Sequence, residues 1–248
     1  MFRKNLFRRI VAFAGKNLLG TITEVSTKKN VAAFTFDDGP SQEYTPKLLD
    51  ILHRYQAKAT FFMLGKQIQQ YPQIVKQVID SGHAIGNHAW DHPSFPMISA
   101  QKRRQQIIRC QQVLEDYDTN LFRPPFGHQN FASRLDTLLL GYKVITWNIA
   151  AEDWLEHNAQ EKAERIIRQI RPGSIILLHD FLFDNPLSRN PDSSADAVDI
   201  ILDKLSNSYQ FVTVPELLKL GRPRKKNWYV KADKAFLAQL KKEPAINV

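Results

Sequence analysis

The sequence contains a single cysteine, Cys110, among its 248 residues. One thiol excludes an intrachain disulfide and any metal cluster built from several cysteines. Cys110 falls on a helical pattern, where we expect an inert, half-buried thiol and not a nucleophile. A disulfide scaffold and a cysteine-based zinc ribbon are therefore excluded.

Long apolar runs are missing as well, and none approaches the roughly 20 residues that a membrane-spanning helix needs. The N-terminus has the early charges of a signal peptide, but its apolar run, residues 10–14, is short and Lys16 soon follows. No clear signal peptide or membrane span is thus recognised. Cytoplasmic, membrane-surface and exported locations all stay open.

Positive charge is concentrated at the two ends of the chain, although the net charge is +9 overall. Lys and Arg outnumber Asp and Glu by 7 to 1 over residues 1–30 and by 8 to 2 over residues 222–248, whereas the residues between carry 19 against 22. The central body is therefore slightly acidic, which argues against nucleic acid as a partner of the domain itself. The basic ends are suited to contact an anionic membrane or cell-wall polymer.

Residues 2–18 have the periodicity of an amphipathic helix. Phe2, Leu6, Ile10 and Phe13 share one face, while the basic residues lie largely elsewhere. Such a helix can lie on an anionic membrane surface or pack on its own domain. The sequence leaves both alternatives open.

From residue 31 onward, short runs rich in β-branched and aromatic residues alternate with longer helical patterns. The expected strands are residues 31–36, 59–64, 83–87, 120–123, 143–149, 174–179 and 210–214. Helices are expected near 43–55, 66–81, 99–117, 129–140, 159–171 and 195–206, with a last one opening at Pro215. This alternation predicts parallel βα units in one α/β domain, residues 31–221, between extensions 1–30 and 222–248.

Unusual polar residues follow five of these runs. In parallel βα architectures the loops after the strands converge on one face, so we expect these side chains to meet. Singly, each has an ordinary structural explanation. Asp-Asp-Gly-Pro is a sequence that favours a tight turn, and a histidine that ends an apolar strand is often a core residue. Their joint placement favours a site made of Asp37, Asp38, His88, His92, Arg123, Asp153 and His179.

These residue types suit metal-assisted hydrolysis. Two imidazoles and one carboxylate make the three-ligand set of a catalytic zinc site and also accept Co²⁺, Ni²⁺ or Mn²⁺. One of the two adjacent aspartates can bind the ion while the other acts as a base on metal-bound water. His179 is a candidate acid for the leaving group. The pattern predicts cleavage of an amide or ester through a tetrahedral oxyanion held by the metal and a backbone N–H.

The segments "TFDDGP", "HAWDHP", "RPPFG", "DW" and "LLHD", in this order, closely resemble the five motifs of the polysaccharide deacetylases, carbohydrate esterase family 4. The resemblance covers roughly residues 31–220. It implies a deformed (β/α)7 barrel that removes acetyl groups from N-acetylglucosamine polymers or, in some members, from acetylated xylan.

The resemblance also implies a role for each matching residue. Asp37 would be the general base and Arg123 would orient it, while His179 would be the general acid and Asp153 would tune it. The metal ligands would be Asp38, His88 and His92. The walls of the substrate groove and of the acetate pocket would come from Pro124, Pro125, Phe126, Trp147, Trp154 and Leu177.

Three positions depart from the usual family pattern. Ala89 stands where Ser or Thr is common, which costs at most some rigidity of the loop. Phe126 replaces a frequent tyrosine, but the oxyanion contact expected there is a backbone N–H that phenylalanine also supplies. Asn148 and Ala150 replace acidic residues of many relatives, which indicates an altered substrate preference.

We therefore expect a metal-dependent hydrolase that removes N-acetyl groups from peptidoglycan or a chitin-like oligosaccharide. Deacylation of a lipid-linked amino sugar and O-acetyl xylan esterase activity are alternatives within the enzyme class. A glycan-binding pseudoenzyme and a polyanion-binding protein are alternatives outside it.

Overall fold

The computed structural model describes residues 20–114, 117–155, 157–183 and 192–230. The basic helix expected over residues 2–18 and the C-terminal residues 231–248 lie outside the described part. Within that part, no helix is long and apolar enough to cross a membrane.

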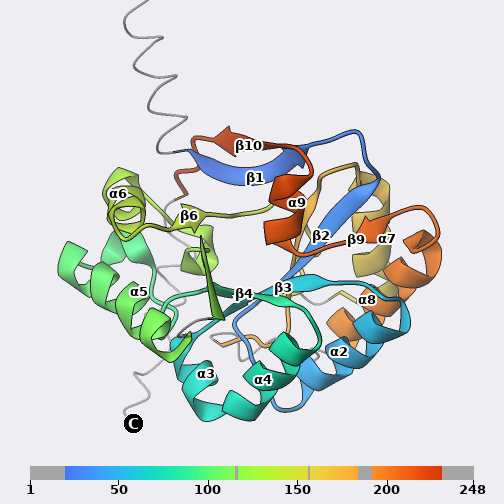
Figure 1. The fold of residues 1–248 in the computed structure, drawn as a ribbon, viewed down its shortest axis with the longest axis horizontal. Coiled ribbons are helices and arrows are strands. Elements are labelled where there is room, and N and C mark those ends of the chain that lie inside the picture. The colour runs from blue at the N-terminus through green and yellow to red at the C-terminus, as the bar shows by residue number, and fades with distance from the viewer. Residues whose placement is uncertain (1–19, 115–116, 156, 184–191, 231–248) are drawn as a thin grey trace, which may run out of the picture.

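A curved parallel sheet forms the centre of the molecule (Figure 1). Seven strands follow the order β6-β5-β4-β3-β2-β8-β7, and β9 pairs with the start of β2. The strands are β2 (Val31–Asp37), β3 (Ala59–Met63), β4 (Ala84–Asn87), β5 (Asp118–Phe122), β6 (Lys143–Val144), β7 (Ile149–Ala150), β8 (Ile175–His179) and β9 (Gln210–Phe211). This topology confirms the expected deformed α/β barrel.

Helices cover the outer face of the sheet (Figure 1). They are α2 (Tyr44–Arg54), α3 (Gly65–Gln70), α4 (Pro72–Asp80), α5 (Ala100–Leu114), α6 (Phe131–Leu139), α7 (Ala159–Gln169) and α8 (Asp192–Leu205). The last helix, α9 (Val214–Lys219), packs instead in a smaller core through Val214 and Leu217. Phe34 and Phe36 of β2 pack in a large core with residues of these helices, while Ala33 belongs to a second, smaller core. Burial on both faces explains why β2 is a continuous apolar run with little alternation.

Two expected elements are broken in the structure. The strand expected over residues 143–149 is divided into β6, which pairs with β5, and β7, which pairs with β8. Between them, the carbonyl groups of Ile145 and Thr146 accept hydrogen bonds from Arg123. The helix expected over residues 66–81 is divided into α3 and α4, with Pro72 at the first position of α4, where its missing N–H does not matter.

The structure also adds two strands that were not expected. β1 (Thr21–Ser26) pairs antiparallel with β10 (Arg222–Lys226), and isolated bridges join Ile22 to Ile145 and Glu24 to Ser174. Ile22 and Val25 are buried in the same core as Ala33. Residues 21–26 and 222–226 therefore belong to the folded body, although the sequence pattern placed them in the two extensions.

Candidate active site

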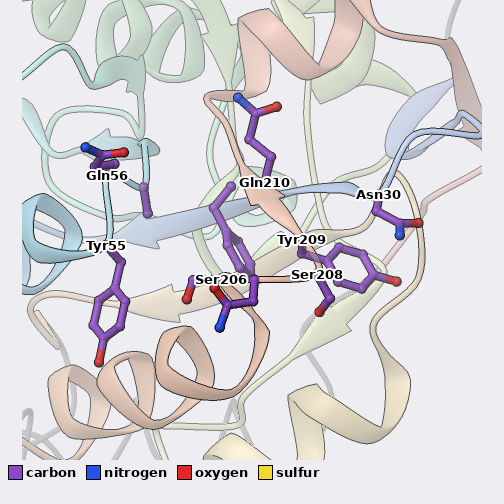
Figure 2. A pocket seen from close by; sticks show the side chains of 10 residues that line it. Asn30, Tyr55, Gln56, Ser206, Ser208, Tyr209 and Gln210 are labelled. Atoms are coloured by element: carbon purple, nitrogen blue, oxygen red, sulfur yellow. The ribbon is translucent and has the colours of Figure 1, made fainter.

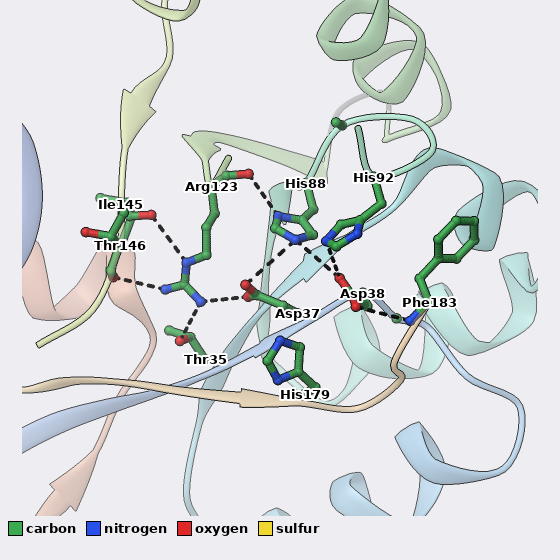
Figure 3. Close-up of polar contacts among 12 residues, drawn as sticks. Thr35, Asp37, Asp38, His88, His92, Arg123, Ile145, Thr146, His179 and Phe183 are labelled. Atoms are coloured by element: carbon green, nitrogen blue, oxygen red, sulfur yellow. Dashed lines mark hydrogen bonds and ion pairs between the residues drawn. The ribbon is translucent and has the colours of Figure 1, made fainter. Parts of the chain in front are cut away.

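Six of the residues singled out from the sequence meet at the C-terminal ends of β2, β4, β5 and β8 (Figure 3), and Asp153, which follows β7, contacts His179. Asp37 ends β2 and His179 ends β8, and the two are paired in register across neighbouring strands. Because residues paired in a parallel sheet point to the same face, their side chains lie together. The expected convergence of these side chains is therefore present.

Asp38, His88 and His92 form the one group of potential metal ligands among the described residues. The Asp38 Oδ1 atom lies 3.3 Å from His88 Nε2 and 3.1 Å from His92 Nε2. One ligand atom from each residue lies within 4.8 Å of the others, and all three side chains are buried. This spacing allows one ion to contact all three residues.

The hydrogen bonds around this group orient its ligand atoms. His88 Nδ1 lies 2.8 Å from the Arg123 carbonyl oxygen, which can only accept, so Nδ1–H donates and Nε2 faces Asp38. The Phe183 N–H donates to Asp38 Oδ2 at 3.2 Å, whereas Oδ1 is a buried atom without a hydrogen-bond donor among the described residues. The His88 Nε2 lone pair and the Asp38 carboxylate oxygen repel each other unless a proton or a cation lies between them. The residues therefore fit a divalent cation.

The electrostatics and the backbone conformation of Asp38 and His92 also indicate a functional site. Burial alone would raise the pKa of the Asp38 carboxyl, but His92 and His88 beside it hold that pKa well below its usual range. Asp38 and His92 both have positive φ, 76° and 64°. For residues other than glycine such conformations cost about 1–3 kcal/mol each and are concentrated at functional sites.

Asp37 is held by Arg123. Arg123 Nη1 donates to Asp37 Oδ1 at 2.6 Å and to Thr35 Oγ1 at 2.8 Å. The fully buried guanidinium lies 4.1 Å from the Phe62 ring and 5.5 Å from the Trp147 ring, as in cation–π contacts. Asp37 Oδ2 lies 3.8 Å from His88 Nε2. One carboxylate oxygen is thus fixed while the other faces the proposed metal group.

His179 is paired with Asp153. Its Nδ1 lies 2.8 Å from Asp153 Oδ1, and its backbone N–H donates to Asp153 Oδ2 at 2.7 Å. Burial alone would lower the pKa of His179, but Asp153, helped by Asp38 and Asp37, raises it to about 9. Burial likewise would raise the pKa of Asp153, and His179 lowers it. The raised pKa favours the protonated imidazole of His179 at neutral pH, and Nε2 is the ring nitrogen that Asp153 does not hold.

The residues expected to line the groove occupy several positions. The Phe126 ring lies 4.2 Å from that of His92 and is half-buried, whereas Pro124 and Pro125 before it are buried. The half-buried Trp154 meets His179 edge to face at 5.7 Å. Phe126 and Trp154 therefore present partly exposed surface beside the site.

The two remaining lining residues lie deeper. Leu177 is buried and pairs in register with Thr35 on the face that carries Asp37. Trp147 packs against the Arg123 guanidinium. Its ring is nevertheless half-buried, so part of it reaches the surface.

Sequence reasoning missed two buried supporting residues, Thr35 and Ser194, and gave no role to a third, Asp180, which follows the sixth expected strand. Thr35 shares a strand face with Asp37, two residues away, and this alternation was a usable signal. Ser194 donates to Asp153 Oδ2 at 2.9 Å across 41 residues of sequence, which no local pattern reveals. Asp180 accepts from the Gly39 N–H at 3.1 Å and from Thr45 Oγ1 at 2.5 Å, and burial raises its pKa to about 7.

A separate cavity of about 460 Å³ lies away from these residues (Figure 2). Its lining includes Asn30, Tyr55, Ser206 and Tyr209. Asn30 immediately precedes β2, so the cavity lies at the opposite end of that strand from Asp37. It is therefore not part of the candidate active site.

Comparisons with known proteins agree with this geometry. The family model described as polysaccharide deacetylase matches residues 24–145. A peptidoglycan-N-acetylglucosamine deacetylase of Bacillus cereus is 35% identical over 200 residues, which cover 79% of this chain and 92% of that protein. The solved structure of the peptidoglycan deacetylase PdaC from Bacillus subtilis is 36% identical with a TM-score of 0.70 and covers 79% of this chain and 93% of that one.

Some relatives are considerably longer. The peptidoglycan-N-acetylglucosamine deacetylase PgdA of Listeria monocytogenes is 35% identical over 209 residues, which cover 81% of this chain. The match takes in only 42% of that protein, so the chain corresponds to less than half of it. Together with the fold and the five motifs at the strand ends, these matches show that the chain belongs to the polysaccharide deacetylase family.

Proposed function

We propose that this protein is a metal-dependent hydrolase that removes N-acetyl groups from an N-acetylglucosamine-containing glycan. Peptidoglycan and chitin-like oligosaccharides are the substrate classes that its relatives support. Zinc is the expected ion, and Co²⁺, Ni²⁺ or Mn²⁺ suit the same ligands.

One observation carries the proposal. Asp37, which pairs with Arg123, and His179, which pairs with Asp153, end adjacent strands in register, beside the only candidate metal group of the described residues. A base, an acid and a cation site are thus supplied to one reaction centre. This completeness argues against a glycan-binding pseudoenzyme.

The ligand set defines what an ion would contribute. Asp38, His88 and His92 would hold a divalent cation, whose chemistry is to polarise a carbonyl group and to lower the pKa of bound water to about 7. The remaining steps belong to protein side chains.

Proton transfers follow from the geometry of the two pairs. Asp37 Oδ2 takes a proton from the water that attacks the amide carbon, while Arg123 holds Oδ1. The Phe126 backbone N–H is the expected donor to the developing oxyanion. His179 Nε2 then protonates the amine nitrogen as the C–N bond breaks, which releases acetate and a free amino sugar. Asp37 returns its proton to solvent and His179 regains one.

Acetate release tests the proposal. We expect purified protein to release acetate from chitooligosaccharides or peptidoglycan, to lose this activity with a chelator and to regain it when zinc is added. Acetylated xylan serves as a parallel substrate, and release from it alone would identify an O-esterase instead. No release from any of the three by protein shown to contain metal would refute the proposal.

A further inference from the structure

The segment after β10 runs along the loop that carries Phe126. The Trp228 indole N–H donates to the Gly127 carbonyl at 2.9 Å, and Gln129 Nε2 donates to the Trp228 carbonyl at 2.5 Å. The Gln129 N–H donates to the Val230 carbonyl at 2.9 Å, and a parallel bridge joins His128 to Val230. Residues 227–230, here called the strap, are thus bound to three consecutive loop residues.

The loop under the strap has an unusual backbone. Phe126 and Gly127 have positive φ in succession, 57° and 66°. A Cβ atom at Gly127 would come within 2.9 Å of the Trp147 ring, so any other residue would force the ring or the backbone to shift and would be strained by the positive φ. Such a turn needs external support to keep one conformation, and the strap supplies hydrogen bonds to it.

Trp228 also contacts one of the expected groove residues through its ring. It meets Trp147 edge to face, with the ring centroids 5.2 Å apart. Trp147 in turn lies against the Arg123 guanidinium, which holds Asp37. On the other side of the turn, the Phe126 ring packs on His92. Trp228 therefore contacts the ring that lies against Arg123 and hydrogen-bonds the residue that follows Phe126.

We propose that Trp228 is a positioning residue that fixes the Phe126–Gly127 turn, and with it the wall and backbone N–H of the groove beside His92. This inference rests on the proposed deacetylase function. It concerns a residue outside the five family motifs and outside the 24–145 match. The strap reaches the groove from the far end of the described chain, so local sequence gives no sign of it.

Three variants of the full-length, zinc-loaded protein test the role of Trp228. Trp228→Ala removes both the ring and the N–H, while Trp228→Phe keeps an aromatic ring and removes the N–H. Tyr229→Ala changes the next residue, whose side chain is 44% exposed, and serves as the matched control. Each variant is assayed for kcat and KM with a chitooligosaccharide, for thermal stability, and for hydrogen exchange of peptides over residues 124–130.

Displacement of a catalytic group by about 1 Å costs up to about a hundredfold in rate, so kcat of Trp228→Ala should fall about ten- to a hundredfold. KM should change little, and Trp228→Phe should restore part of the kcat. Exchange over residues 124–130 should become about tenfold faster in Trp228→Ala, because local opening becomes easier, while exchange over β2 stays unchanged. Tyr229→Ala should match the parent protein.

Two results would overturn the inference. One is kcat and exchange of Trp228→Ala that equal those of Tyr229→Ala. The other is a raised KM with unchanged kcat and unchanged exchange, which would make Trp228 a substrate contact. If the parent protein released no acetate at all, the proposed function would fail first. The exchange comparison would then decide separately whether Trp228 fixes the turn.

Discussion

Asp37 and Asp38 are adjacent in the sequence but have different partners. Arg123 holds one oxygen of Asp37, whereas Asp38 faces His88 and His92. Asp37→Asn keeps the shape of the side chain and removes the base. We expect metal content close to that of the parent protein and a kcat lower by about 10²- to 10⁴-fold. Elemental analysis and acetate release on the same preparation measure both quantities.

Asp38→Asn is the matched comparison for this division of roles. It removes the anionic ligand, so metal content and activity should fall together. Arg123, which pairs with Asp37, is left in place by either change. Full activity of Asp37→Asn, or loss of metal from both variants alike, would show that the assignment of base and ligand is wrong.

The His179–Asp153 pair sets the expected alkaline limit of activity. Asp153 raises the pKa of His179 to about 9, so the acid form persists through neutral pH and is lost as the pH rises through that value. A cation bound at Asp38 would lower this pKa by repulsion between positive charges. We expect kcat/KM to decline on the alkaline side, and Asp153→Asn to move that decline toward lower pH by about a unit or more.

The same shift links protonation to stability. The pKa of His179 in the folded chain, about 9, lies above its ordinary value of 6.5. Its contribution to the free energy of unfolding is therefore complete below pH 6.5 and is lost as the pH rises from 6.5 to 9. NMR titration of His179 in the parent protein and in Asp153→Asn measures the pKa directly. An identical pKa in both would contradict the proposed role of Asp153.

Individual elements show what the sequence could predict and what it could not. The core strands and the residues at their ends were predictable, because buried parallel strands are short apolar runs and their C-terminal ends share one edge. β10 was not predictable, since its sequence RPRKK has four cations and a proline and forms a strand only as the partner of β1. The contact between Ser194 and Asp153 depends on tertiary packing of α8 and leaves no local pattern.

Asp180 connects the end of β8 to the loop after β2. Its carboxyl group accepts from the Gly39 N–H and from Thr45 Oγ1, and all three residues are buried. Asp180→Ala would leave these two donors unpaired, at about 1–3 kcal/mol for each buried group. We expect a lower free energy of unfolding, measured by urea titration, and reduced activity because Gly39 follows Asp38 directly.

Two variants make this measurement specific. Asp180→Asn keeps one acceptor oxygen and should lose less stability than Asp180→Ala. Asp196→Ala, on the exposed face of α8, should change the free energy of unfolding by no more than about 0.5 kcal/mol. Equal stability of Asp180→Ala and Asp196→Ala would mean that the β8 to β2 connection has no energetic importance.

For the whole molecule, the boundary of the folded body differs from the boundary that composition indicates. Charge marks residues 1–30 and 222–248 as separate ends. The pairing of β1 with β10 nevertheless joins parts of both ends to the barrel beside β6 and β8. A body with a slightly acidic centre is thus completed by a basic two-stranded sheet.

β1 should consequently be essential for folding although it lies outside the predicted domain. Ile22 and Val25 are 4% and 1% exposed, and burial of each such side chain contributes about 1.5–3 kcal/mol. Removal of residues 1–30 should therefore lower the free energy of unfolding by several kcal/mol of a total of about 5–15 kcal/mol, whereas removal of residues 1–19 should leave the barrel folded.

Point mutations make the same comparison. Ile22→Ala alone should lower the free energy of unfolding by about 2–5 kcal/mol, and Lys28→Ala, at an exposed position, should change it very little. Circular dichroism during thermal unfolding measures each case, and a chain without residues 1–30 that melts like the parent would show that β1 is dispensable.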